Sequence, residues 1–126
     1  MRHIVDGYRF MMSLAYNDCA RICFTHFFPY KNILSYNGEN DCTAEETEFI
    51  IDFLKPNEYN DYDQLIQLCD AISFPLVAIY IEKRLVYVVL RRGFNDLTIP
   101  KWKAFLELKD YFNQKTESDI HKIIGV

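Results

Sequence analysis

The sequence has little glycine, little proline and no long hydrophobic run. Four glycines and four prolines among 126 residues argue against a loop-rich or low-complexity chain. The longest apolar stretch runs from Phe74 to Ile81, which is far short of the roughly 20 residues that a membrane-spanning helix needs. The first residues, Met1 to His3, do not resemble the start of a signal peptide. We therefore expect a cytoplasmic protein that does not contact a membrane.

An excess of positive charge is also missing. The formal net charge is −4 at pH 7, which provides no general attraction to nucleic acid. The hydrophobic content is 50% and the charged content is 25%, the proportions of a folded domain. No repeat or linker-like segment divides the chain, so we expect residues 1–126 to form a single domain with a modest core.

Several catalytic motifs are absent. The chain has no glycine-rich phosphate loop, no Gly-x-Ser-x-Gly turn and no Cys-x-x-Cys pair, so nothing supports the enzyme classes that these motifs mark. Without a secretory signal, we interpret its cysteines as free thiols and not as a disulfide framework. They are Cys19, Cys23, Cys42 and Cys69.

Helix signals are abundant. Thr43 and Glu46 form a capping box, which predicts a helix from Ala44 to Leu54. Asn60 is a cap followed by acidic residues, and it predicts a second helix that ends before Pro75. Apolar residues at helical spacing predict three further helices, over residues 5–14, 17–27 and 98–112.

The segment 75–93 admits two interpretations. Its runs of branched and aromatic residues on either side of residues 82–84 favour a β-hairpin by propensity. Against the hairpin stand the helical surroundings, the absence of a tight-turn sequence, and Gly93 at the place of a helix cap. We favour a helix from Ile79 to Arg92. The chain is then predicted to be all-α, a bundle of about five to six helices.

Asp70 is the first candidate functional residue. At 100° per residue its helix has one apolar face, formed by Tyr62, Leu65, Ile66, Cys69 and Ile72. Asp70 borders this face, and a carboxylate in that position is a candidate metal ligand.

His26 belongs to two candidate metal sites. Cys19, Cys23 and His26 recur at i, i+4 and i+7 and could bind zinc, although the same face carries apolar residues and we favour a core stripe there. His3, His26 and Asp70 together supply nitrogen and oxygen ligands for a divalent cation. Such a cation would activate water for phosphoester hydrolysis. The alternative is that the histidines are hydrogen-bonded core groups.

A basic run could hold a phosphate through forked hydrogen bonds. It consists of Lys83 and Arg84, followed by Arg91 and Arg92. The alternative is a solvated helix face, which is the commoner role of such a run. Lys83 and Arg84 are the candidate phosphate-binding pair.

Five segments together resemble the C-terminal part of bacterial HD-domain phosphohydrolases. The segments are residues 6–26, 38–42, 59–73, 82–95 and 99–112, so that the resemblance extends along nearly the whole chain. The resemblance implies an all-helical fold that holds a divalent metal with a His, an adjacent His-Asp pair and a distant Asp. Asp70 matches the distant Asp, and His3 and His26 resemble the extra histidines that complete a second metal site in many members.

The chain departs from the family pattern in one respect, because none of its histidines is followed by Asp. We expect that it starts just after the helix that would carry the His-Asp pair, so that the family's N-terminal helices are missing. Most of the first metal shell would be missing with them. A second copy or a protein partner is then expected to cover the apolar surface that those helices would bury.

Two functions are therefore expected. The resemblance implies a relative of metal-dependent phosphohydrolases that acts on a nucleotide or other small phosphoester, with a divalent metal ion as cofactor and with impaired or no independent catalysis. The alternative is a non-catalytic helical interaction module that self-associates or docks on a protein partner. The sequence specifies neither the catalytic residues nor the substrate.

Overall fold

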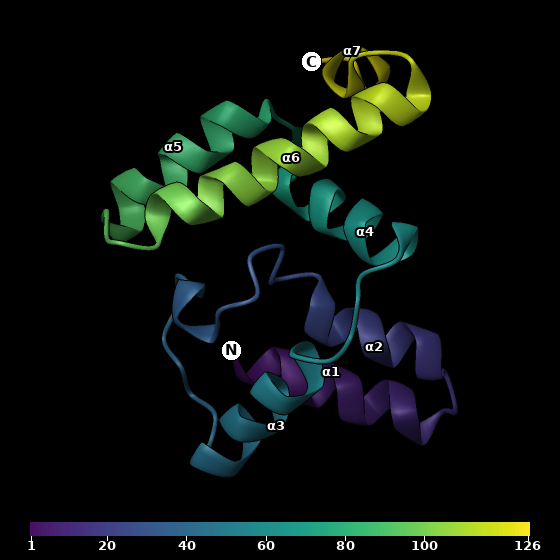
Figure 1. The fold of residues 1–126 in the computed structure, drawn as a ribbon, viewed down its shortest axis with the longest axis vertical. Helices are drawn as coiled ribbons and strands as arrows, with labels where there is room; N and C mark the ends of the chain where they lie inside the picture. The colour runs from purple at the N-terminus through teal and green to yellow at the C-terminus, as the bar shows by residue number, and fades with distance from the viewer.

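The computed structural model describes residues 1–126 and shows an all-α protein (Figure 1). None of its helices combines the length and the apolar character needed to cross a membrane. The elements are α1 (Arg2–Ser13), α2 (Asn17–Thr25), the 3-10 helix η1 (Ile33–Ser35), α3 (Ala44–Leu54), α4 (Asp61–Ala71), β1 (Ser73–Phe74), β2 (Val77–Ala78), α5 (Ile81–Arg92), α6 (Thr98–Thr116) and α7 (Ile120–Ile124).

Both predicted N-terminal caps are confirmed. The Thr43 hydroxyl accepts a hydrogen bond from the Glu46 backbone N–H at 3.1 Å, and the Glu46 carboxylate accepts one from the Thr43 N–H at 3.0 Å. Asn60 and Asp63 form the same reciprocal pair at the start of α4. These local bonds satisfy backbone donors that a helix leaves unpaired, which is why both helices begin where the sequence predicts.

Most of the segment with two interpretations is helical, as we favoured. α5 occupies Ile81–Arg92, two residues later at its start than the predicted Ile79, and ends at Gly93, whose φ of +92° lies in the region that favours glycine. A short hairpin occupies the beginning of the segment, before α5. β1 and β2 pair antiparallel, with Phe74 opposite Val77. Pro75 and Leu76 make the turn between them, and Leu76 adopts a φ of +71°.

The C-terminal end contains one helix more than we expected. α6 continues to Thr116 instead of Phe112, and α7 follows it. The Asp119 carboxylate accepts a hydrogen bond from the His121 N–H at 2.9 Å and so caps α7. Five residues are too few to show a periodic apolar pattern in the sequence, and this helix is held by packing against its neighbours.

The core consists of two separate apolar clusters. One is built from α1, α2, α3 and adjoining residues: Met1, Ile4, Val5, Phe24, Phe28, Ile50 and Leu54. The other is built from α4 to α7 and adjoining residues: Leu68, Ala71, Ile72, Ile81, Leu85, Leu108, Phe112 and Ile120. In Figure 1 the first three helices form the lower half of the molecule, and α5, α6 and α7 form the upper half.

Polar contacts join the two halves where α2 meets α4. The Arg21 guanidinium lies 2.8 Å from the Asp63 carboxylate, and the Thr25 hydroxyl donates to the same carboxylate at 2.8 Å. The Gln67 amide donates to the Thr25 carbonyl at 2.8 Å. Asp63 and Gln67 are buried. Because hydrogen bonds are directional, these contacts set how the halves face each other.

The apolar face predicted for α4 is wrong. Of its members only Ile72 is buried, and Tyr62 is 74% exposed. The face that α4 buries consists instead of Asp63, Gln67, Leu68 and Ala71. Two polar side chains replace apolar ones because they bind α2, so tertiary hydrogen bonding overrides the hydrophobic pattern.

Candidate anion-binding site

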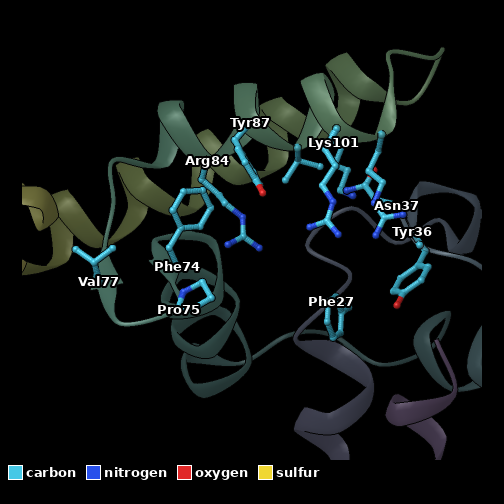
Figure 2. Close-up of a pocket in the computed structure, with 13 residues that line it drawn as sticks. Phe27, Tyr36, Asn37, Phe74, Pro75, Val77, Arg84, Tyr87 and Lys101 are labelled. Carbon is cyan, nitrogen blue, oxygen red and sulfur yellow. The ribbon is translucent and has the colours of Figure 1, made fainter.

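A cavity of about 520 Å³ lies between the two halves of the molecule. Small-molecule sites typically measure about 300–1,000 Å³. Figure 2 shows Phe74, Arg84 and Tyr87 on one side of it and Phe27 and Tyr36 on the other. The lining residues are Phe27, Tyr36, Asn37, Gly38, Phe74, Pro75, Val77, Arg84, Tyr87, Val88, Arg91, Arg92 and Lys101.

Three arginines of α5 enter the lining. Arg84 and Arg91 are seven residues apart and therefore lie on the same face of the helix, and Arg92 follows directly. The predicted phosphate-binding residue Arg84 is thus at the cavity. Its predicted partner Lys83 is exposed and does not line the cavity, because a step of one residue turns a side chain by about 100° around a helix.

Arg84 is held in place before any ligand arrives. Its guanidinium donates to the carbonyl oxygen of Ser73 and lies 5.2 Å from the centre of the Phe74 ring. The Phe74 ring in turn makes an edge contact with Tyr87, with 4.8 Å between ring centres. A cation stacked on an aromatic face loses little freedom when it binds an anion.

None of the cationic groups in the lining is neutralised by a carboxylate. Arg84, Arg91, Arg92 and Lys101 form no ion pair, and no Asp or Glu lines the cavity. The other arginines of the chain are all paired: Arg2 and Arg9 with Glu46 at 2.6 and 3.0 Å, and Arg21 with Asp63 at 2.8 Å. In a chain of net charge −4, the cavity is therefore a concentrated positive region.

Lys101 supplies the fourth cation from α6. Its ammonium donates to the backbone carbonyl of Ser35 at 2.6 Å, across 66 positions of sequence. Burial lowers the pKa of Lys101 to about 8. A bound anion would favour the charged form of this amine, because an opposite charge nearby stabilises it.

The loop after η1 forms the opposite wall. Burial and the charge of Asp41 raise the pKa of the Tyr36 phenol, while the charge of Arg92 lowers it. Gly38 lies against the Tyr36 ring, and a Cβ atom at position 38 would come within 2.7 Å of Tyr36 Cε1. The absence of a side chain at Gly38 is therefore what allows the Tyr36 ring its position.

A second, smaller cavity adjoins the first. It measures about 90 Å³, and Phe27, Arg84 and Lys101 are among the residues that line both. His26 and the half-buried Asp70 line this smaller space. The structure thus places two of the predicted metal ligands next to the arginine-lined cavity.

His3 lies near the same two residues but does not join them as a third ligand. Partial burial lowers the pKa of His3, as do the charges of the N-terminal ammonium and His26, whereas Asp41 and Asp70 raise it. The His3 and His26 rings both pack on Phe27, with ring centres 5.0 and 4.3 Å away.

The three predicted metal ligands do not come together as a site in this structure. No group of three or more His, Cys, Asp or Glu side chains is placed so that it could hold a metal. The Nδ1 atom of His26 is 2.8 Å from the carbonyl oxygen of Ile22, on its own helix, and its Nε2 atom has no such contact.

The core stripe predicted over residues 16–27 is only partly confirmed. Ala20 is buried and Cys23 and Phe27 are half-buried, but Tyr16 and Cys19 are exposed, and Phe24 is buried in their place. The thiols of all four cysteines are free, and Cys19, Cys23 and His26 form no zinc-type cluster. Burial, with a smaller effect of the neighbouring Cys19, raises the pKa of Cys23.

The sequence analysis missed Lys101 and the aromatic walls. One signal was present for Lys101, which lies close to the N-terminus of its helix, where a positive charge is unfavourable. For Arg91, the helical spacing from Arg84 was a signal. No local sequence pattern indicates that Phe27 and Tyr36 face Phe74 and Tyr87, because the first pair comes from one half of the chain and the second pair from the other.

Comparisons with protein-family models, with curated protein sequences and with solved structures find no match for this chain. The relation to HD-domain phosphohydrolases therefore stays a prediction.

Proposed function

We propose that this protein binds the phosphate group of a small phosphoester in the arginine-lined cavity. The observation that carries the proposal is the set of four cationic side chains, Arg84, Arg91, Arg92 and Lys101, which line one cavity without a carboxylate partner. Arginine presents a planar fork of donors that matches phosphate oxygens. An unneutralised cluster of this kind is a physical reason for an anion to bind.

The aromatic walls favour an organic group on the phosphate. Phe27 and Tyr36 on one wall and Phe74 and Tyr87 on the other offer flat apolar surfaces beside the cations (Figure 2). A planar organic group can stack on such rings while its phosphate meets the arginines. This combination supports the nucleotide or other small phosphoester implied by the resemblance to HD-domain phosphohydrolases.

Hydrolysis is a separate question from binding. The family resemblance assigns a divalent metal to Asp70, His26 and His3, and such a metal supplies the activated water for hydrolysis. Those three side chains do not converge as ligands in this structure. We therefore propose a phosphoester-binding relative of that family with impaired or no independent catalysis.

Calorimetric titration with inorganic pyrophosphate and adenosine monophosphate tests the binding. Arg84→Gln and Arg91→Gln are each expected to weaken binding at least about tenfold, since each removes a charge-assisted contact. Lys83→Gln is the matched control, because it removes one positive charge from the next position of the same helix without touching the cavity. Equal losses in Lys83→Gln and Arg84→Gln would show that only general charge matters.

Incubation of the same variants with phosphoesters tests the hydrolysis. Phosphate release is measured with manganese, cobalt, nickel or iron added, and we expect none above the rate of a preparation of Asp70→Ala. Release that depends on a metal and disappears in Asp70→Ala would instead show that the family's chemistry is retained.

A second candidate function is self-association through the outer face of α5. Val86 and Leu90 lie one turn apart and are 48% and 81% exposed, and Phe94 just beyond the helix is 64% exposed. Contiguous exposed apolar groups of this size often mark contact surfaces. Sedimentation velocity of the protein and of Leu90→Glu tests this function: a concentration-dependent dimer that Leu90→Glu abolishes supports it, and a monomer at all concentrations contradicts it.

A further inference from the structure

Lys101 differs from the arginines around it in its chemistry. It lines both of the adjoining cavities. It has no carboxylate partner, and its one hydrogen bond in the structure is to the backbone carbonyl of Ser35 at 2.6 Å. That contact anchors the end of a flexible side chain, so the nitrogen has a defined place at the cavity wall.

An anchored amine in a half-buried, cationic cavity is a nucleophile when it is neutral. Burial lowers the pKa of Lys101 to about 8 from the ordinary 10.5. At pH 7 the neutral fraction of the amine in the empty cavity is then roughly a tenth, about three hundredfold more than for an exposed lysine, and a bound phosphate reduces this fraction. A neutral amine keeps two N–H donors, so it can still donate to Ser35 while its lone pair is free to react.

We propose that Lys101 forms an imine with a small aldehyde that carries a phosphate group, with the phosphate held by Arg84, Arg91 and Arg92. This inference rests on the proposed function, because it uses the same arginines to hold the same anionic group. It adds a covalent step at one nitrogen atom, and it restricts the ligand to phosphoesters with a reactive carbonyl.

The step is balanced without any oxidant or reductant. The lone pair of the Lys101 nitrogen forms a bond to the carbonyl carbon, the π electrons move to the oxygen, and a proton passes from nitrogen to that oxygen. The hydroxyl group takes a second proton from the solvent and leaves as water while the nitrogen lone pair forms the C=N bond, so both bonds of the carbonyl group are broken and the nitrogen keeps one N–H and a positive charge. A protonated imine retains one N–H, which can still donate to the Ser35 carbonyl.

Pyridoxal 5′-phosphate, an aldehyde with a phosphate group, is the probe. The full chain is incubated with it at pH 7.5 and reduced with sodium borohydride, and the modified lysine is located by peptide mass spectrometry. We expect one adduct per chain, at Lys101. 5′-Deoxypyridoxal, which lacks the phosphate and cannot close to an internal hemiacetal, should label Lys101 about tenfold more slowly, because it forfeits the charge-assisted contacts. Inorganic phosphate should slow the labelling by the phosphorylated probe.

Two variants control for non-specific labelling and for folding. Lys101→Arg keeps the positive charge but cannot form an imine, so it should lose the adduct while still binding pyrophosphate. Lys103→Arg removes an exposed lysine from the same helix and should leave the adduct unchanged. Circular dichroism of both variants confirms that each is folded before the labelling is compared.

Two results would overturn the proposal in different ways. If the labels are spread over the exposed lysines and the protein still binds pyrophosphate, imine formation at Lys101 is contradicted, whereas the proposed phosphoester site is still supported. If both aldehydes label Lys101 equally and the protein does not bind pyrophosphate, the proposed phosphoester site is contradicted as well.

Discussion

The carboxylate of Asp63 lies 2.8 Å from the guanidinium of Arg21, and this pair joins the two halves of the molecule. Asp63 is fully buried, and Arg21 also donates to Asn57 and to the Glu58 carbonyl. The same carboxylate accepts the Thr25 hydroxyl and the Asn60 N–H. One side chain thus caps α4 and ties it to α2.

Asp63→Asn is expected to destabilise the protein by about 2 kcal/mol, since hydrogen bonds to a charged group are replaced by neutral ones. Urea unfolding, followed by the fluorescence of Trp102, measures the change. Asp52→Asn is the control, because Asp52 is an exposed acid on α3 without an ion pair. Similar stabilities of the two variants would refute the role assigned to Asp63.

The same carboxylate makes stability depend on pH. Burial raises the pKa of Asp63, but hydrogen bonds from Arg21, Asn60 and Thr25 outweigh it and hold the pKa below the ordinary 3.8. A depressed pKa contributes stability that is complete above the unfolded value and is lost as the pH falls through the folded value. We expect the stability gap between the wild type and Asp63→Asn to narrow from about pH 4 downwards. A gap that stays constant from pH 6 to pH 2.5 would contradict this.

Leu76 holds an unfavourable backbone conformation on the surface. Its φ is +71°, and its side chain is fully exposed. Leu76→Gly should raise stability by about 0.5–1 kcal/mol, because relief of the Cβ clash exceeds the entropy that glycine adds to the unfolded chain. Leu76→Ala keeps the Cβ atom and should give no such gain in the melting temperature. A gain of equal size in both variants would point to the lost apolar surface instead.

His121 caps α5 from a distant position. Its Nε2 atom accepts a hydrogen bond from the buried Ile81 N–H at 3.0 Å, whereas the adjoining Tyr80 provides no side-chain cap. His121→Leu leaves that N–H without a partner and should cost about 1–3 kcal/mol of stability. Lys122→Leu, at the exposed next position, is the comparison in the same urea assay. If both variants unfold at the same urea concentration, the cap contributes nothing.

Gly38 gives the Tyr36 wall its position. The Cβ atom of Gly38→Ala would lie 2.7 Å from Tyr36 Cε1, so the ring must shift. We expect the affinity for adenosine monophosphate to fall a few-fold while overall stability changes little, because the loop is on the surface. Glu39→Ala, next to it in the same loop, should bind like the wild type. Unchanged affinity of Gly38→Ala for adenosine monophosphate would show that Tyr36 does not contribute to binding.

Asp70 distinguishes charge-driven binding from metal-driven binding. Its carboxylate lines the small cavity together with Arg84 and Lys101, where it repels an incoming anion. Asp70→Asn should therefore leave pyrophosphate affinity unchanged or tighten it a few-fold, and EDTA should have no effect on the wild type. Binding that EDTA abolishes and manganese restores only when Asp70 is present would make Asp70 a metal ligand.

The residues of the site show which parts of it were accessible to sequence reasoning. Arg84 and Asp70, which were singled out by their charge, line the cavities, and their binding roles stay predictions. Lys83 lines neither cavity because one step along a helix turns a side chain by about 100°, whereas Arg91 lies seven residues from Arg84 and therefore on the same face. Lys101 is placed by a contact with Ser35 across 66 positions of sequence, for which no local pattern exists.

The sequence by itself determined where α3 and α4 begin and that the chain is all-α. The reciprocal bonds of Thr43 with Glu46 and of Asn60 with Asp63 act within four residues, so they operate wherever those residues stand. Tertiary structure alone decided which helix faces are buried and which residues line the cavity. Asp63 is buried only because Arg21 and Thr25 meet it, and the cations share one space only because two separate cores are packed together. Local hydrogen bonds are short-ranged, whereas burial and electrostatic fields depend on every group that the fold brings near.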